Sequence, residues 1–241
     1  MEAVPAVTRR RNERIFYLAM TFAIVVTVFA GFAPTYYLRP AFNSTPLLPL
    51  LHFHGLVFSS WIVLLIIQTT LVARKRTDIH RRLGIAGFIL ASLMVIVGAV
   101  TALIRAKQGA APLPEIPPAA FLVVPLGDML VFAILIAAGF YFRRQPGAHK
   151  RLMLLATIAI LAAAVARLPF SIMQAGPPAF FGVTDLFIVP LVIYDLVTLK
   201  RVHRATLFGG LLIIASQPLR LILAGTGAWL AFANWLISLA P

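Results

Sequence analysis

In a chain of 241 residues, 61% of the side chains are hydrophobic and only 12% are charged, which excludes an ordinary soluble domain. The chain contains no cysteine, and this excludes disulfides, thiolate metal sites and haem attachment through a Cys-x-x-Cys-His motif. The net charge of +14 would suit a nucleic-acid-binding protein, but the basic residues lie in short loops between apolar runs, where membrane topology places them. We therefore predict an integral membrane protein whose partner is the lipid bilayer and not a nucleic acid.

Seven apolar runs of about 18–24 residues follow one another, each long enough to cross a hydrocarbon core of about 30 Å as a helix. They cover residues 15–33, 50–72, 83–104, 119–142, 152–170, 182–199 and 206–224. Only a helix satisfies all of its backbone polar groups within a single span, so the pattern predicts an all-α bundle of seven transmembrane helices over residues 15–224. No small-residue cleavage site follows the first run, which indicates an uncleaved helix rather than a signal peptide.

The basic residues lie mainly on one side of these runs. Sixteen of the 21 lysines and arginines fall in segments 1–14, 74–82, 143–151 and 200–204. The opposite side and its helix ends hold Arg39, Arg105, Lys107, Arg167 and Arg220. Because such an excess marks the cytoplasmic side, we expect a cytoplasmic N-terminus and an external C-terminus. The chain is thus predicted to be a multi-pass protein of the bacterial inner membrane.

An apolar tail, residues 225–241, follows the seventh run and contains Trp229 and Trp235. It is too short to cross the bilayer. Tryptophan favours the depth of the lipid headgroups. We expect the tail to form an interfacial helix or an extension of the seventh helix.

Several polar side chains are predicted to lie at compatible depths in the outer half of the membrane. They are Asp128, Arg167, Asp185, Gln217 and Arg220. Charged residues within a membrane usually face the bundle interior or a wet cavity, so this polar cluster could pair internally or line a pocket for a polar ligand. Two alternatives stay open. Asp185 is placed at a predicted helix start, where the helix dipole favours a carboxylate, and the two arginines can extend to the outer interface.

The segment His52-Phe53-His54-Gly55 lies at the outer end of the second run. Imidazole is a common ligand of copper, zinc and haem iron. Residues two apart point to nearly opposite faces of a helix, so both histidines could bind one metal only in an irregular turn after Pro49. Otherwise we expect one to face the bundle and the other the outer loop. An interfacial hydrogen-bonding role is the alternative.

Three further histidines, His80, His149 and His203, each begin a helix at the inner side and precede a basic residue. Together they could bind a metal, or two of them could bind a haem axially while neighbouring arginines bind its propionates. Asp195, in the sixth run, could orient one of these histidines. Ordinary interface chemistry at a cytoplasmic helix end is the alternative.

The stretches Thr77-Asp-Ile-His80-Arg-Arg-Leu-Gly84 and Ala148-His149-Lys-Arg-Leu-Met153 resemble a group of bacterial multi-pass inner-membrane proteins. Some of that group are similar to haem–copper oxidase assembly factors or b-type cytochromes. The resemblance covers mainly the second to fifth runs, and it implies a role near the respiratory membrane with a histidine-bound haem. Two-haem membrane cytochromes need histidine pairs at both depths. Here the outer leaflet has histidines on one helix alone, so one haem on the inner side is the most that the pattern accommodates.

Three functions are consistent with these features. The first is a haem- or metal-binding protein in a respiratory redox or assembly role, alongside respiratory-chain proteins or as a homo-oligomer. The second is a transporter or receptor that binds a small anionic or amphipathic ligand at the outer polar cluster. The third is an accessory subunit without chemistry of its own. The chain carries none of the usual soluble enzyme motifs, such as a Gly-rich phosphate loop or a Gly-x-Ser-x-Gly elbow.

Overall fold

The computed structural model describes the backbone of residues 6–42, 46–111 and 115–240, with side chains from residue 11 onward. Over these residues the chain is helical and contains no strand. The longer helices are α1 (Ala6–Phe32), α3 (Pro49–Ala73), α4 (Thr77–Lys107), α6 (Val123–Tyr141), α7 (Pro146–Ala159), α10 (Val189–Leu199), α11 (Arg204–Ala224) and α12 (Gly227–Leu239). The shorter ones are α2 (Arg39–Phe42), α5 (Pro118–Phe121), α8 (Ala162–Val165) and α9 (Pro177–Asp185), and a π-helical turn over Ala33–Tyr37 extends α1.

Seven helical segments are long and apolar enough to cross a membrane, which confirms the predicted number of spans. They cover Arg11–Tyr37, Pro49–Ala73, Thr77–Lys107, Pro118–Arg144, Pro146–Val165, Pro177–Leu199 and Arg204–Ala224. Four of these spans begin with a proline. Proline suits the first position of a helix because the N–H that it lacks would have no intrahelical partner there.

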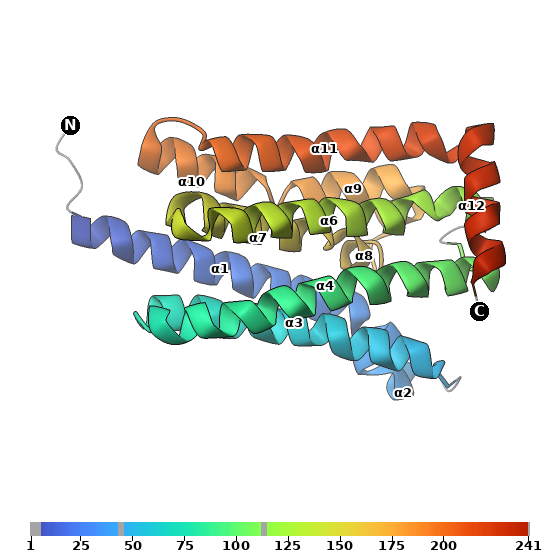
Figure 1. Ribbon diagram of the computed structural model, residues 1–241, viewed down its shortest axis with the longest axis horizontal. Coiled ribbons are helices and arrows are strands. Elements are labelled where there is room, and N and C mark those ends of the chain that lie inside the picture. The colour runs from blue at the N-terminus through green and yellow to red at the C-terminus, as the bar shows by residue number, and fades with distance from the viewer. Residues whose placement is uncertain (1–5, 43–45, 112–114, 241) are drawn as a thin grey trace.

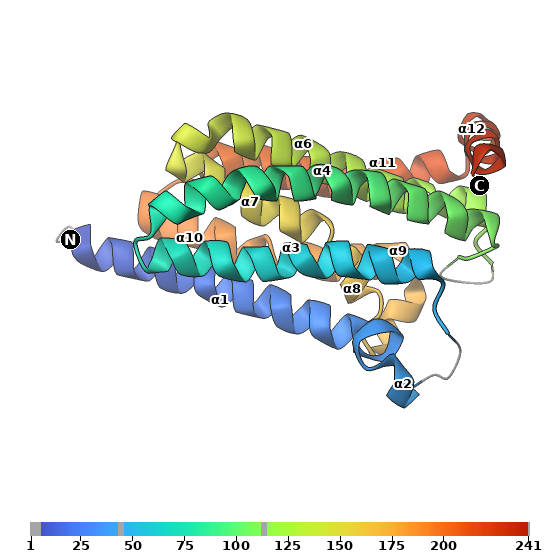
Figure 2. The same cartoon turned by 60° about the horizontal axis from the view of Figure 1, so that its bottom comes forward.

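The long helices lie side by side and connect at two ends of an elongated bundle (Figures 1 and 2). The N-terminal end holds the start of α1 and the short connections at residues 74–76, 142–145 and 200–203. The C-terminal end holds α2, α12 and the end of the chain. The strongly basic segments of the sequence therefore gather at the N-terminal end.

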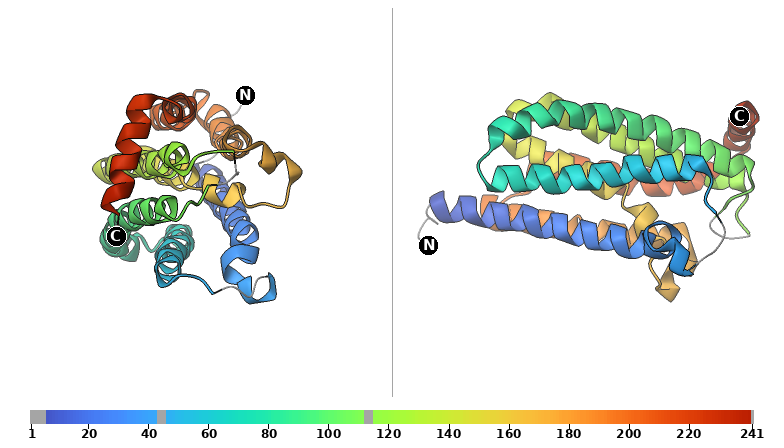
Figure 3. Two further views of the ribbon diagram at one scale, coloured as in Figure 1. Left: turned by 90° about the vertical axis from the view of Figure 1, so that its right-hand side faces the viewer. Right: turned by 90° about the horizontal axis from the view of Figure 1, so that it is seen from below.

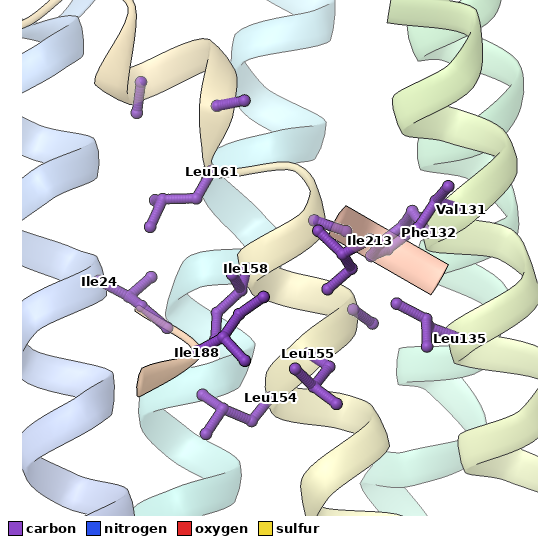
Figure 4. Packing of buried hydrophobic residues seen from close by; sticks show 14 of the residues in the cluster. Ile24, Val131, Phe132, Leu135, Leu154, Leu155, Ile158, Leu161, Ile188 and Ile213 are labelled. Atoms are coloured by element: carbon purple, nitrogen blue, oxygen red, sulfur yellow. The ribbon is translucent and has the colours of Figure 1, made fainter. Parts of the chain in front are cut away.

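Helix α7 lies at the centre of the packing. Its residues Leu154, Leu155 and Ile158 are at most 4% exposed, and they lie between α1, α6 and α11 in Figure 4. The contacting side chains include Ile24 of α1 and Ile213 of α11, both of which are also buried. The predicted fifth run is thus the core helix of the bundle, whereas the outward faces of α1, α3 and α4 expose many large apolar side chains, as lipid contact requires.

Two of the predicted runs are interrupted. The backbone N–H of Leu161 bonds to Ile158 O, three residues back, and this tighter turn separates α7 from α8. The predicted fifth run, 152–170, extends too far, because the span ends at Val165 ahead of Pro169. The sixth span begins at Pro177, earlier than predicted, and breaks between α9 and α10. Pro190 accounts for this break, since its ring excludes the carbonyl four residues back.

Helix α12 is a separate helix and not an extension of α11. It runs across the C-terminal end of the bundle, over the ends of α4 and α5 (Figure 3). The Thr226 hydroxyl caps it by accepting the Trp229 N–H at 3.2 Å. The Trp229 indole N–H donates to Ala119 O at 3.0 Å, and Lys107 Nζ donates to Ala240 O at 2.6 Å. These bonds fix α12 to the neighbouring helices.

Candidate functional site

A cavity of about 660 Å³ lies in the half of the bundle that is nearer its C-terminal end. It is lined by α1, α3, α4, α6 and the α7–α8 break. Most of its wall is apolar and includes Phe32, Phe58, Phe121 and Phe180, which come from α1, α3, α5 and α9. The polar side chains on the wall include Thr35, Tyr36, Tyr37, Arg39, His54, Ser59, Thr101, Arg105, Asp128, Thr157 and Arg167. An apolar cavity of this size with a few convergent polar groups is typical of a small-molecule site.

Two arginines give this cavity a positive charge that nearby carboxylates do not balance. Arg105 donates to Gln108 Oε1 at 2.9 Å, and Arg167 donates to Ala163 O at 2.5 Å while lying over the Phe32 ring. In the described part of the chain neither forms an ion pair. Both side chains are exposed at this end of the bundle. A bound anion would balance their charge.

Two residues that line the cavity, His54 and Thr101, each have a buried polar atom without a hydrogen-bond partner among the described residues. These atoms, His54 Nδ1 and Thr101 Oγ1, are shielded from solvent. Other hydroxyls of the wall are bonded, for example Ser59 to Tyr37 at 3.0 Å. His52, two residues before His54, is exposed on the other face of α3, and its carbonyl accepts from Tyr36. Of the two predicted outer histidines, only His54 lines the cavity.

Asp128 and Arg220 form an ion pair beside this cavity. Arg220 Nη1 lies 2.5 Å from Asp128 Oδ1, and the two residues are 5% and 7% exposed, respectively. The same guanidinium donates to Val124 O at 3.3 Å and to Ser216 Oγ at 2.7 Å. Arg220 is therefore directed into the bundle and not toward the outer interface, and it ties α11 to α6.

Asp185 and Gln217 form a second contact, between α9 and α11, in which the amide donates to the carboxylate at 2.8 Å. Asp185 is the last residue of α9. The prediction that it opens a helix is therefore wrong, because the sixth helix starts at Pro177 and breaks after Asp185. The five predicted cluster residues thus divide into two pairs and Arg167, and only Asp128 and Arg167 line the cavity.

At the N-terminal end, two of the three predicted inner histidines lie together. The rings of His80 and His149 are 6.1 Å apart, and His149 Nδ1 lies 2.8 Å from Gly139 O. His80 Nδ1 is buried and lacks a partner in the described chain. His203 has another role, because its Nδ1 accepts the Ala205 N–H and caps α11. Over residues 6–42, 46–111 and 115–240, no three His, Cys, Asp or Glu side chains gather to hold a metal ion.

A buried polar network near these histidines centres on Asp195, whose side chain is fully buried. It forms an ion pair with Arg151, accepts from Thr206 Oγ1 at 2.6 Å, and accepts the His203 backbone N–H at 3.0 Å. Asp195 therefore contacts the backbone of His203 and does not orient its ring. Arg151 was placed in a cytoplasmic loop by sequence. The signal for its burial is Pro146, which starts α7 five residues earlier.

Comparison with known proteins adds no further assignment. The chain matches no protein-family profile, and searches of curated proteins and of solved structures found no significant match.

Proposed function

We propose that the chain binds a small amphipathic anion within the membrane, as a transporter or receptor. The acidic group binds at Arg105 and Arg167, and the apolar body occupies the cavity. The observation that carries the proposal is the presence of these two arginines, without carboxylate partners among the described residues, on an otherwise mainly apolar cavity of about 660 Å³.

We also propose an orientation of the bundle in the membrane, with the N-terminal end in the cytoplasm. The basic segments at the N-terminal end support a cytoplasmic N-terminus in a bacterial inner membrane. The cavity, at the C-terminal end, then lies in the outer half of the bilayer. An anion that enters from the outer leaflet or the external face reaches the arginines without crossing the membrane centre.

The chemistry of the wall selects the class of ligand. A guanidinium binds a carboxylate or a phosphate through two parallel hydrogen bonds. Charged side chains are costly inside a membrane and usually mark a functional pathway or a paired site. The apolar rings of Phe32, Phe58 and Phe180 require a ligand that is largely hydrocarbon. A free inorganic anion would leave this surface uncovered, so the supported ligand has both parts.

We expect Arg167→Ala to weaken binding of hexadecanoic acid by about 10-fold to 100-fold, since a hydrogen bond to a charged group contributes about 1.5–3 kcal/mol. Arg167→Lys retains the charge but loses the two parallel hydrogen bonds of the guanidinium. The affinity of this variant for hexadecanoic acid should therefore lie between those of the native protein and Arg167→Ala. The measurement is equilibrium binding of radiolabelled hexadecanoic acid to the protein in phosphatidylcholine nanodiscs. Hexadecyl phosphate as a competitor then distinguishes a carboxylate-selective site from one that accepts either acid.

Arg143→Ala is the matched control. Arg143 lies at the N-terminal end, over the Phe140 ring and bonded to Phe140 O, and it does not line the cavity. Its loss should leave hexadecanoic acid binding unchanged. Equal binding by the native protein and Arg167→Ala, with both folded, would remove the basis of the proposal.

A haem b or metal site at His80 and His149, in a respiratory redox or assembly role, is the second candidate. Histidine ligands usually donate their second ring N–H to a carbonyl or carboxylate, and His149 Nδ1 lies 2.8 Å from Gly139 O in that manner. His80 on α4 supplies a second imidazole 6.1 Å away, edge-on to His149, with a buried, unbonded nitrogen in the described chain. Iron ligated there would supply one-electron chemistry.

On this candidate, His149→Ala should abolish the α and β bands in the dithionite-reduced minus oxidised absorption spectrum of protein purified after expression with haem. His52→Ala, at the exposed position on α3, should leave the spectrum unchanged. A native protein with a flat difference spectrum excludes haem. Metal analysis of the same samples then tests for an ion without visible absorption.

A further inference from the structure

We infer that the cavity limits the chain length of the acid that it binds, and that a straight-chain acid of about 12–14 carbons fills it. The inference rests on the proposed function and specifies the ligand class more narrowly. It assigns Ile62 and Met129, at the closed end of the cavity, as residues that set this limit.

The cavity has the same length along two of its walls. Its lining residues extend from Leu51 to Ile62 along α3 and from Pro118 to Met129 along α5 and α6, and in each case the two residues are eleven positions apart. At about 1.5 Å per residue, each wall is about 16 Å long. An extended alkyl chain advances about 1.25 Å per carbon, because its bonds of about 1.5 Å alternate in direction, so about 13 carbons cover this length.

The two arginines lie toward the open end of the cavity. Arg105 follows Gly98, the deepest lining residue of α4, by seven residues, and Arg167 follows Thr157, the deepest lining residue of α7, by ten. Both helices run toward the C-terminal end of the bundle (Figure 1), and both arginines are exposed there. The acid group therefore binds near the mouth, and its chain runs toward the middle of the bundle.

A layer of large buried side chains closes the other end of the cavity. It consists of Ile24, Trp61, Met94 and Phe132, which come from α1, α3, α4 and α6 and are at most 4% exposed. None of the four lines the cavity, and each lies within about one helical turn of the deepest lining residue on its own helix. The Trp61 indole N–H donates to Thr157 Oγ1 at 3.3 Å, and the indole packs edge-on against Phe132. A longer chain would have to displace these packed side chains.

The closed end predicts how affinity depends on chain length. Each methylene that moves from water into the apolar cavity tightens binding about 4-fold. Once the chain reaches the closed end, a further carbon bends the chain or moves the acid away from the arginines. Affinity should therefore rise with each carbon up to the limit and stop rising there.

The test measures binding of saturated straight-chain acids, from octanoic to icosanoic acid, to the protein in phosphatidylcholine nanodiscs. Dissociation constants refer to the free acid in water, and nanodiscs without protein correct for acid dissolved in the lipid. We expect about 4-fold tighter binding per carbon up to 12–14 carbons and no gain beyond them. A rise that continues unchanged to icosanoic acid, while binding still requires Arg167, overturns the inference and leaves the proposed function intact. If none of the acids binds, both fail.

Substitutions at the closed end should move the limit in both directions. Ile62→Trp shortens the cavity, so the ratio between the affinities of tetradecanoic and decanoic acid should fall about 10-fold below that of the native protein. Ile62→Ala lengthens the cavity, so hexadecanoic acid should bind about 10-fold more tightly than tetradecanoic acid, a gain that the native protein lacks. Met129→Ala should act as Ile62→Ala does, from the facing wall.

Val63 and Leu130 provide the matched controls. Each follows one of the two limiting residues in the sequence, lies outside the cavity lining, and is 54% or 62% exposed, respectively. Val63→Trp, Val63→Ala and Leu130→Ala should therefore keep the native limit. If the three variants at Ile62 and Met129 also keep it, in samples with native unfolding temperatures, these residues do not set the limit and the assignment is overturned.

Discussion

Replacing Asp195 by alanine is expected to lower the free energy of unfolding by about 3–5 kcal/mol, because it leaves a buried arginine without its counter-charge. Arg151 is 3% exposed, so the folded bundle shields its charge from water. The substitution also removes the acceptor for Thr206 Oγ1 and for the His203 N–H, which holds the connection between α10 and α11. Unfolding in mixed detergent micelles, followed by circular dichroism, measures the loss.

A double variant separates the charge from the packing. Asp195→Leu combined with Arg151→Met replaces the pair by apolar side chains, and such replacements are often neutral or stabilising, so most of the lost stability should return. The control is Asp78→Ala, which breaks an ion pair with Arg76 whose side chains are 57% and 63% exposed. Exposed ion pairs contribute little to the free energy of unfolding. If Asp195→Ala costs no more than Asp78→Ala, the buried network does not stabilise the bundle.

Gly31→Ala is expected to destabilise the protein by about 1–3 kcal/mol through overpacking. An added Cβ would lie 2.2 Å from Ala164 O and 2.8 Å from Ala164 C, both backbone atoms that cannot rotate away. Helix α1 must therefore move from α8. Because Val28 and Phe32 of α1 line the cavity, the shift should also weaken hexadecanoic acid binding. The same unfolding and binding assays measure both effects.

Gly182→Ala provides the comparison for this change. Gly182 lies inside α9, and the described chain places no atom within 4 Å of an added Cβ. Alanine favours a helix interior over glycine by about 1 kcal/mol, so this variant should be as stable as the native protein or slightly more so. Equal stability of the two variants would show that α1 and α8 separate without cost.

Hydropathy predicted the seven spans because the apolar composition of each run is independent of how the helices pack. It could not detect the breaks at Ile160–Leu161 and at Leu186–Ile188, because both interruptions are made of apolar residues. The end of the fifth span was consequently placed beyond Pro169. For the second break the available signal was Pro190, a turn downstream, since proline affects the backbone and not the hydropathy. The first break has no proline within a turn of it.

Less of the candidate site than of the fold could be predicted from the sequence. Asp128 and Arg220 could be predicted as site residues because charge is rare in these runs, and the structure pairs them. The sequence does not single out Thr101 or Arg105 as site residues. A helix that is apolar on all sides gives no sign of which face contacts the bundle and which contacts lipid. The rotation of α4 depends on Gly98 admitting Phe58 and Met129, a contact between three helices that no single run contains.

The central position of α7 constrains how the chain is inserted into the membrane during synthesis. This span has the lowest mean hydropathy of the seven and is the most enclosed by protein, and it carries Arg151 within it. Arg151 follows the start of this span by five residues, so it opposes insertion by less than the roughly 2.5–3.5 kcal/mol of an arginine at the centre of a span. Together with the low hydropathy of the span, this charge favours entry of α7 as a hairpin with α6. Its counter-charge, Asp195, is synthesised 44 residues later. Until α10 arrives, Arg151 must be accommodated by headgroups or by the insertion machinery, and α7 can take its central place only after that.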